Sequence, residues 1–139
     1  WVLKSEKLGQ YNEVSRQKRF FKECENHKIL LKQLLNTLKK QGKNIVGYGA
    51  STKGNVILQY CGINEKLINK IAEVNKYKFN KYTPGTNIKI VSEKKAMKNI
   101  PDYLLVLPWH FKDHIIKREN KFLKKGGKLI FPLPDIEII

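Results

Sequence analysis

Residues 43–56 constrain the fold more than any other stretch, because their sequence is typical of a strand, a tight turn and a helix start. Two β-favouring residues lead into Gly47 and Gly49, which allow the backbone to turn sharply. Ser51 or Thr52 can then cap the helix that follows. The unpaired backbone N–H groups at such a helix start favour a bound phosphate.

The known phosphate-binding motifs match this stretch only in part. A dinucleotide fingerprint needs a third glycine where the chain has Thr52, and the next glycine is Gly54. A P-loop needs a lysine and a hydroxyl residue after Gly54, but Asn55 follows. Two interpretations stay open: an anion-binding turn of unassigned type, or a plain connection that needs glycine only for steric reasons.

Helix-like and strand-like segments alternate along the chain. Residues 11–41 lack glycine and proline and have apolar residues at helical spacing, from Phe20 to Leu38, which predicts a long helix ended by Gly42. Because a small domain does not need so long a helix, we expect its polar first half to project or to rest on another domain. We expect strands at 67–74, 88–90, 103–107 and 128–131, and helices after residue 51, at 92–97 and up to residue 125.

This alternation predicts an α/β fold: a Rossmann-like, mostly parallel sheet flanked by helices and preceded by one long N-terminal helix. Residues 1–42 would form that helix, which would pack on or link to an upstream domain, and residues 43–139 would form the Rossmann-like domain. The apolar run at 103–107 is typical of a strand covered on both faces.

Three segments are expected on one rim of this sheet, because open α/β sheets bind ligands beyond the carboxyl ends of their strands. They are residues 49–55, 73–78 and 109–110. Within them, Lys53 and Lys78 can pair with phosphate groups as point charges.

Several rim residues have a structural interpretation beside the functional one. Glu73 can hydrogen-bond a ribose or face solvent, and the polar loop 75–87 is a surface connection or a lid. Trp109 can stack on a ring or close the edge of the sheet. His110 is the one attractive acid–base candidate, but without an identifiable partner carboxylate the sequence favours a loop histidine that contacts ligand or solvent. His114 has the same alternatives, so no catalytic residue is assigned.

The net charge of +16 suggests a nucleic-acid partner, but the pattern of charges does not support one. Only three of the 28 basic residues are arginines, and the lysines are spread evenly without interleaved aromatic residues. Abundant lysine, asparagine and isoleucine are also explained by an A/T-rich genome. We therefore do not expect nucleic acid as a partner.

The two cysteines, Cys24 and Cys61, argue against a disulfide framework, and their spacing from the histidines matches no structural zinc site. The sequence has no signal peptide or membrane-spanning segment, so we expect neither a metal nor a membrane partner, and a cytoplasmic location. Because the chain opens on Trp1 without an initiator methionine, we expect a fragment of a longer protein.

Four motif blocks, in order, resemble the C-terminal domain of sugar (NDP-hexose) C-methyltransferases that depend on S-adenosylmethionine (SAM). The first block is long and specific, and the resemblance covers the chain from about Leu30 to its end. The blocks are GYGASTKGN at 47–55, PGTNIKI at 84–90, LPWHF at 107–111 and GKLIFPLP at 127–134.

The resemblance implies a function that composition cannot show. Members of this family transfer a methyl group from SAM to a ring carbon beside the ketone of a nucleotide-linked 4-keto-deoxysugar. They contain a zinc domain, a SAM-binding domain and a Rossmann-like C-terminal domain that helps hold the nucleotide sugar. This chain looks like the third domain only, so SAM and zinc would bind upstream, and no cofactor is expected in this fragment. Its partners would be the nucleotide sugar and the upstream domains.

The resemblance also implies which residues contact the nucleotide sugar, and it places the histidine that deprotonates the sugar upstream of Trp1, so His110 is a catalytic candidate only through its position on the rim. The chain departs from the family at Glu73, Asn80, Lys89, His110 and His114, where an aspartate, a glycine, a proline, an asparagine and a glutamate are usual. These departures are compatible with an altered sugar preference or with neutral drift. The implied contact residues are Gly49, Ala50, Ser51, Thr52, Lys53, Gly54, Asn55, Glu73, Lys78, Trp109 and His110.

Two alternative functions stay open. Gly47, Gly49 and Glu73 also suit a nicotinamide dinucleotide-binding module. The long first helix also suits a non-catalytic scaffold that only docks onto the SAM domain.

Overall fold

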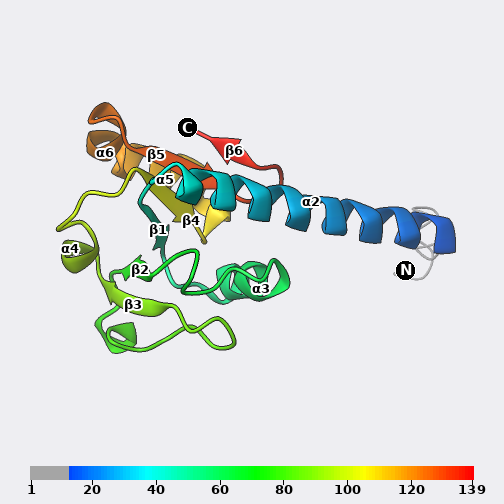
Figure 1. The fold of residues 1–139 in the computed structure, drawn as a ribbon, viewed down its shortest axis with the longest axis horizontal. Helices are drawn as coiled ribbons and strands as arrows, with labels where there is room; N and C mark the ends of the chain where they lie inside the picture. Colours follow the sequence, from blue (N-terminus) through cyan, green and yellow to red (C-terminus); the bar gives the residue numbers. More distant parts are fainter. Residues whose placement is uncertain (1–12) are drawn as a thin grey trace, which may run out of the picture.

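The computed structural model describes residues 13–139, so the predicted start of the long helix at residues 11 and 12 lies outside the described residues. One long helix is followed by alternating strands and short helices (Figure 1). In chain order the elements are α2 (Val14–Lys40), β1 (Ile45–Tyr48), α3 (Thr52–Tyr60), β2 (Lys70–Glu73), η1 (Lys76–Lys78), β3 (Lys89–Ser92), α4 (Glu93–Ala96), β4 (Tyr103–Val106), η2 (Trp109–Phe111), α5 (Lys112–Arg118), α6 (Asn120–Lys124), β5 (Lys128–Phe131) and β6 (Glu137–Ile138).

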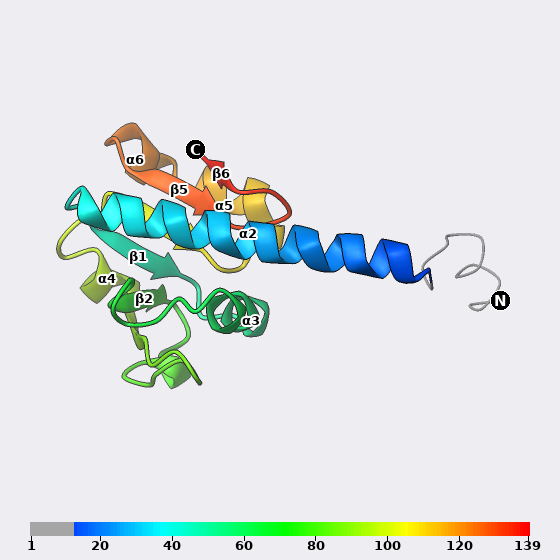
Figure 2. The same ribbon diagram turned by 45° about the vertical axis from the view of Figure 1, so that its right-hand side comes forward.

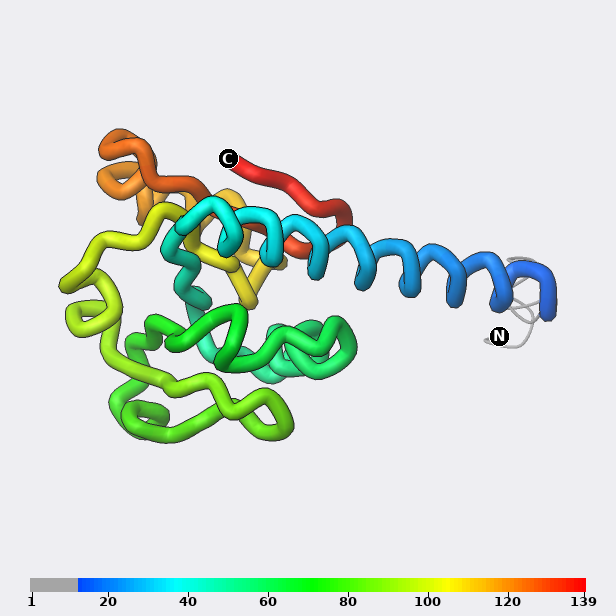
Figure 3. Tube along the Cα trace, viewed as in Figure 1, coloured from blue at the N-terminus to red at the C-terminus, as the bar shows by residue number. Residues whose placement is uncertain are grey.

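All strands belong to one sheet with the order β3-β2-β1-β4-β5-β6. The first five are parallel, and β6 pairs antiparallel with β5 at one edge. The trace in Figure 3 shows this C-terminal segment running back along the sheet edge. In this doubly wound sheet the order of strands reverses between the parallel strands β1 and β4, the point where such sheets bind ligands. The predicted α/β, mostly parallel fold is confirmed.

The sheet is covered on both faces, because each central strand is apolar on both sides. Along β1, Ile45 packs with α2 and α3 on one face, and Val46 packs with α4, α5 and α6 on the other. Leu105 and Leu104 divide in the same way along β4. Burial on both faces explains the continuous apolar runs that predicted these strands.

Helix α2 packs on the sheet only through its C-terminal half. Leu31, Leu35 and Leu38 are buried, whereas Phe20 is 68% exposed, so the apolar spacing continues past the part of the helix that packs on the sheet. The reason is length: α2 has 27 residues, and each strand it covers has four. Figures 1 and 2 show the N-terminal half of α2 extending past the sheet.

Two predicted boundaries shift in the structure. The helix expected to reach residue 125 is divided into α5 and α6 at Glu119, whose carboxylate accepts a hydrogen bond from the Tyr48 hydroxyl at 2.8 Å. The strand expected at 67–74 pairs only over Lys70–Glu73. Of the helices formed by residues 13–139, none is long and apolar enough to cross a membrane.

Asn80, which stands where the resembling family has glycine, has a left-handed backbone (φ +61°). Asparagine tolerates this conformation better than other residues with a side chain. We therefore expect Asn80→Ala to lower the free energy of unfolding by about 1 kcal/mol, and Asn80→Gly to preserve or raise it. Urea denaturation of the two variants measures the difference. Equal loss in both would contradict a conformational cause and point instead to the lost side chain.

Candidate functional site

The turn between β1 and α3 is shaped by two close approaches. Gly49 has φ +76°, and a Cβ there would lie 2.9 Å from the ring of Pro108. Gly54 is buried, and its Cβ would lie 2.4 Å from the Cβ of Leu107. Helix α3 therefore begins directly against the segment that leaves β4, and both glycines are sterically required.

The start of α3 offers free backbone donors. Ser51 is the N-cap, and its Oγ accepts a hydrogen bond from the Gly54 N–H at 3.0 Å. The N–H of Ala50 donates to Glu73. The N–H groups of Thr52 and Lys53 have no acceptor among the described residues. They are the donors through which the positive end of a helix binds an anion.

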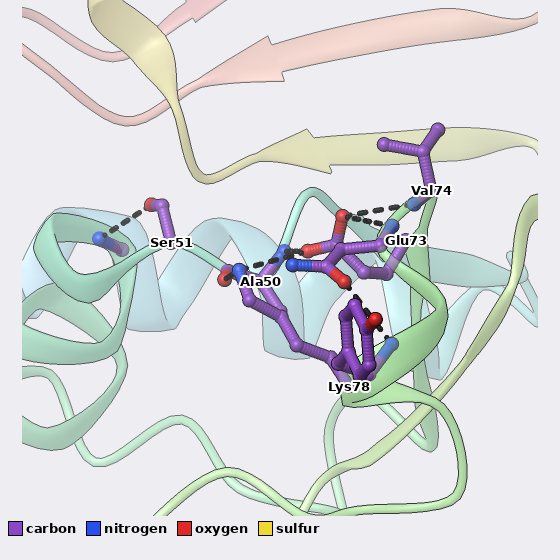
Figure 4. Close-up of polar contacts among 8 residues, drawn as sticks. Ala50, Ser51, Glu73, Val74 and Lys78 are labelled. Carbon is purple, nitrogen blue, oxygen red and sulfur yellow. Dashed lines mark hydrogen bonds and ion pairs between the residues drawn. The ribbon is translucent and has the colours of Figure 1, made fainter.

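Glu73, at the end of β2, holds this turn in place (Figure 4). One carboxylate oxygen accepts from the N–H groups of Val74 at 2.8 Å and Asn75 at 3.0 Å. The other accepts from the Ala50 N–H at 3.0 Å and lies 3.4 Å from the Lys78 ammonium. The residue is 7% exposed. Burial alone would raise the pKa of Glu73, but the backbone donors and the Lys78 charge outweigh it and hold the pKa below its ordinary value.

Lys78 joins the loop after β2 to the same turn. Its ammonium donates to the Ala50 carbonyl oxygen at 2.7 Å and pairs with Glu73. Figure 4 shows the side chain reaching from η1 across the rim toward Ala50. The side chain is 42% exposed, so its charge stays accessible to a ligand. The Lys78 ammonium thus holds residues 76–78 against the rim and lies near the start of α3.

Two hollows flank this turn. The first, of about 270 Å³, lies toward α4 and α5 and includes Tyr48 and Phe111 in its wall. The second, of about 250 Å³, lies between α3 and the loop before β3 and includes Asn55 and Thr83. Ala50, Ser51 and Lys78 line both hollows, and we call these three residues the ridge.

Charged side chains contact one another in the wall of the first hollow. Arg118 donates to both carboxylate oxygens of Glu93, at 2.7 and 2.6 Å, and lies over the Tyr48 ring. Burial, and then the hydrogen bond to Glu119, raise the pKa of the Tyr48 hydroxyl well above its ordinary value. The Tyr48 hydroxyl is thus already engaged with Glu119, and the residue forms part of the wall of the first hollow.

The structure brings together most of the residues expected to contact ligand. Those that line a hollow are Gly49, Ala50, Ser51, Thr52, Asn55, Glu73 and Lys78. Gly54 lies beneath them as a packing residue.

The side chains of Lys53, Trp109 and His110 line neither hollow. Trp109 packs partly against the core, and His110 is exposed between the rings of Trp109 and Phe111, at centroid distances of 5.9 and 4.2 Å. A ligand contact by these residues stays a prediction. His114, which the sequence placed one turn further on, does line the first hollow.

Sequence reasoning missed Tyr48, Phe111, Glu93 and Arg118 as wall residues. Phe111 carried a signal, because it follows Trp109 and His110 on the expected rim. Glu93 and Arg118 carried none, because they meet only through the packing of α4 and α5. In residues 13–139, no three His, Cys, Asp or Glu side chains are grouped to hold a metal ion.

Comparison with known proteins gives two matches. A family model described as "C-methyltransferase C-terminal domain" matches residues 1–134. The chain is also similar to the C-methyltransferase NovU of Streptomyces niveus, with 36% identity over 109 residues. That alignment covers 78% of this chain and 26% of the relative, so the chain spans about a quarter of the relative's length.

Proposed function

Because the chain belongs to the family of C-methyltransferase C-terminal domains, we propose that it binds the substrate of a SAM-dependent C-methyltransferase, an NDP-linked 4-keto-deoxysugar. In the full-length enzyme, upstream domains hold SAM and zinc, and this domain presents the nucleotide sugar to them in the cytoplasm. The fragment does not catalyse methyl transfer by itself.

One observation supports the diphosphate part of this proposal most. The free N–H groups of Thr52 and Lys53 and the ammonium of Lys78 are grouped at the same turn, beyond the carboxyl end of β1. Backbone donors at a helix start and a lysine point charge are the groups that proteins use to bind phosphates. The negative charge of Glu73 does not offset these donors, because its carboxylate is buried and already hydrogen-bonded to three backbone N–H groups.

The same carboxylate argues against NAD in this domain. Rossmann folds that bind NAD use a free acidic group at the end of the second strand to hydrogen-bond the ribose. Glu73 is in that position, but it accepts from three backbone N–H groups and pairs with Lys78. Glu73 is therefore not free to bind the ribose of NAD, and SAM binding is proposed for an upstream domain.

A docking role can accompany the binding role. In the half of α2 that extends past the sheet, more than 60% of the surface of each of three apolar residues is exposed: Val14, Phe20 and Phe21. A hollow of about 500 Å³ lies beside it, lined by α2, α3 and residues 133–135. Exposed apolar side chains of this size are typical of surfaces that another domain covers. We propose that the SAM domain covers them.

We expect Lys78→Gln to weaken the binding of dTDP by about tenfold, because it removes one charged hydrogen-bond donor from the diphosphate site. We expect Lys53→Ala to weaken it by less than about threefold, because that side chain is exposed and lies outside both hollows. Isothermal titration calorimetry at moderate salt measures both variants.

Two controls complete this titration. Lys78→Arg keeps the charge and should retain most of the affinity, and melting temperatures confirm that all variants fold. UDP and GDP test selectivity: equal, salt-sensitive binding of all three nucleotides would show that the +16 charge merely attracts diphosphates. A larger effect of Lys53→Ala than of Lys78→Gln would contradict the diphosphate position.

A further inference from the structure

The two hollows share the ridge but differ in chemistry. Each hollow is smaller than the roughly 300 Å³ at which small-molecule pockets usually begin, whereas the two together fall within the usual range. A nucleotide sugar has the same division, because its diphosphate separates a nucleoside from a hexose. The proposed diphosphate position on the ridge would direct these two ends into opposite hollows.

The first hollow suits the nucleoside. Phe111 lies in its wall and is 57% exposed, with the His110 ring 4.2 Å from its own between centroids, so the exposed part of the Phe111 ring can contact a base. The charge of Arg118 is already neutralised by Glu93, so this wall does not select for a second phosphate. Pro108 and Ile115 add apolar lining to this hollow, and the Tyr48 hydroxyl is already bonded to Glu119.

The second hollow suits the hexose. None of its described lining residues is aromatic; Leu58 and Leu107 form its apolar part, and Asn55 and Thr83 its polar part. The Oδ1 atom of Asn55 is buried without a donor among the described residues, so a rotation of this amide would offer an unmet acceptor to a sugar hydroxyl.

The second hollow also lies on the correct side for methyl transfer. Leu58 and Leu107 belong to the core cluster that packs against α2, so this hollow shares the face of the sheet that α2 covers. Figures 1 and 2 show α2 extending along that face beyond the strand ends. A domain that precedes α2 would therefore meet the second hollow rather than the first.

Resting on the proposed function, we infer that the ligand binds in a fixed direction: the diphosphate on the ridge, the nucleoside against Phe111 in the first hollow, and the hexose beside Asn55 in the second hollow. This direction turns the hexose toward the face along which α2 extends. The first hollow then determines the choice of nucleotide, and the second determines the choice of sugar.

Amide chemical shifts of the ¹⁵N-labelled chain test this direction with three ligands. Sodium pyrophosphate should shift the Thr52 and Lys53 amides. It should leave the amide shifts of the residues in the far wall of each hollow unchanged. The nucleotide dTDP should add shifts at Val74 and His114 in the first hollow. dTDP-glucose should add shifts at Asn55 and Thr83 in the second. Added dTDP shifts in the second hollow would overturn the direction. If no ligand shifts the Thr52 and Lys53 amides, the proposed function itself fails.

A matched pair of variants tests the stacking contact. Phe111→Ala should weaken dTDP binding roughly tenfold and leave pyrophosphate binding unchanged. Tyr77→Ala removes an aromatic side chain that is 86% exposed and lines neither hollow, so it should change neither ligand. If Phe111→Ala binds dTDP as tightly as the wild-type chain does, the placement of the nucleoside is wrong. Pyrophosphate binding by the same variant would show that the diphosphate position is unaffected by that result.

Discussion

Gly54→Val is expected to lower the free energy of unfolding by about 3 kcal/mol or more. A Cβ at this position would lie 2.4 Å from the Leu107 Cβ, 3.2 Å from the Leu107 Cα and 2.9 Å from the Ser51 Oγ. Leu107 cannot move away easily, because it is 1% exposed and its backbone follows β4. The helix must therefore shift away from the sheet.

The same shift would disturb the site. Ser51 caps α3 through the Gly54 N–H, and displacement of that N–H removes the cap, which alone contributes about 1 kcal/mol. We expect dTDP binding to be lost together with stability. Urea denaturation and calorimetry measure the two effects on the same preparation.

Lys53→Ala is the matched control for stability, because it changes the adjacent, exposed residue of the same helical turn. We expect its free energy of unfolding to stay within about 0.5 kcal/mol of the unchanged chain. If Gly54→Val is as stable as Lys53→Ala, close packing of α3 on Leu107 is not what requires glycine.

Glu73→Ala is expected to lower the free energy of unfolding by about 3–5 kcal/mol, because several backbone donors lose their acceptor together. The N–H groups of Ala50, Val74 and Asn75 would each be left without a partner. Lys78 would also lose its ion pair. Glu65→Ala, which removes an exposed carboxylate, is the control and should have little effect. Equal stability of the two variants would show that water satisfies these donors.

The pH dependence of stability gives an independent test of Glu73. Its pKa in the folded chain is lowered, so the native state favours the ionised form more than the unfolded chain does. The resulting stabilisation is fully present above the ordinary pKa of 4.5 and is lost as the pH falls through the lower pKa of the folded state. Glu73→Gln should flatten this acid limb in urea denaturation measured from pH 6 to pH 3. An unchanged acid limb would assign the acid sensitivity to other carboxylates.

The order of strands and helices could be predicted because its signals are local. Apolar runs such as residues 103–107, and the glycines near residue 50, report backbone preferences within a few positions. The rim could be predicted because one topological rule places the carboxyl ends of parallel strands together. The division between α5 and α6 could not, because it coincides with Glu119, which bonds to Tyr48 across 71 positions of the chain.

The candidate site was predictable as a place but not as a set of contacts. Lys53 and Lys78 look alike in the sequence, yet only the side chain of Lys78 lines the hollows. Its ammonium donates to the Ala50 carbonyl oxygen, 28 positions away in the chain. Phe20 continues the helical spacing of the apolar face, but the sheet ends before it and leaves it exposed. These outcomes depend on where distant elements meet.

By itself the sequence determined the α/β class, the strand-turn-helix at 45–60 and the position of the candidate rim, since periodicity and glycine act over short distances. Only the tertiary structure decided that Glu73 supports the turn instead of facing a ribose, that Lys78 carries the charge, and that the rim is divided into two hollows. The physical reason is that hydrogen-bond saturation and cavity shape arise from residues that folding alone brings into contact.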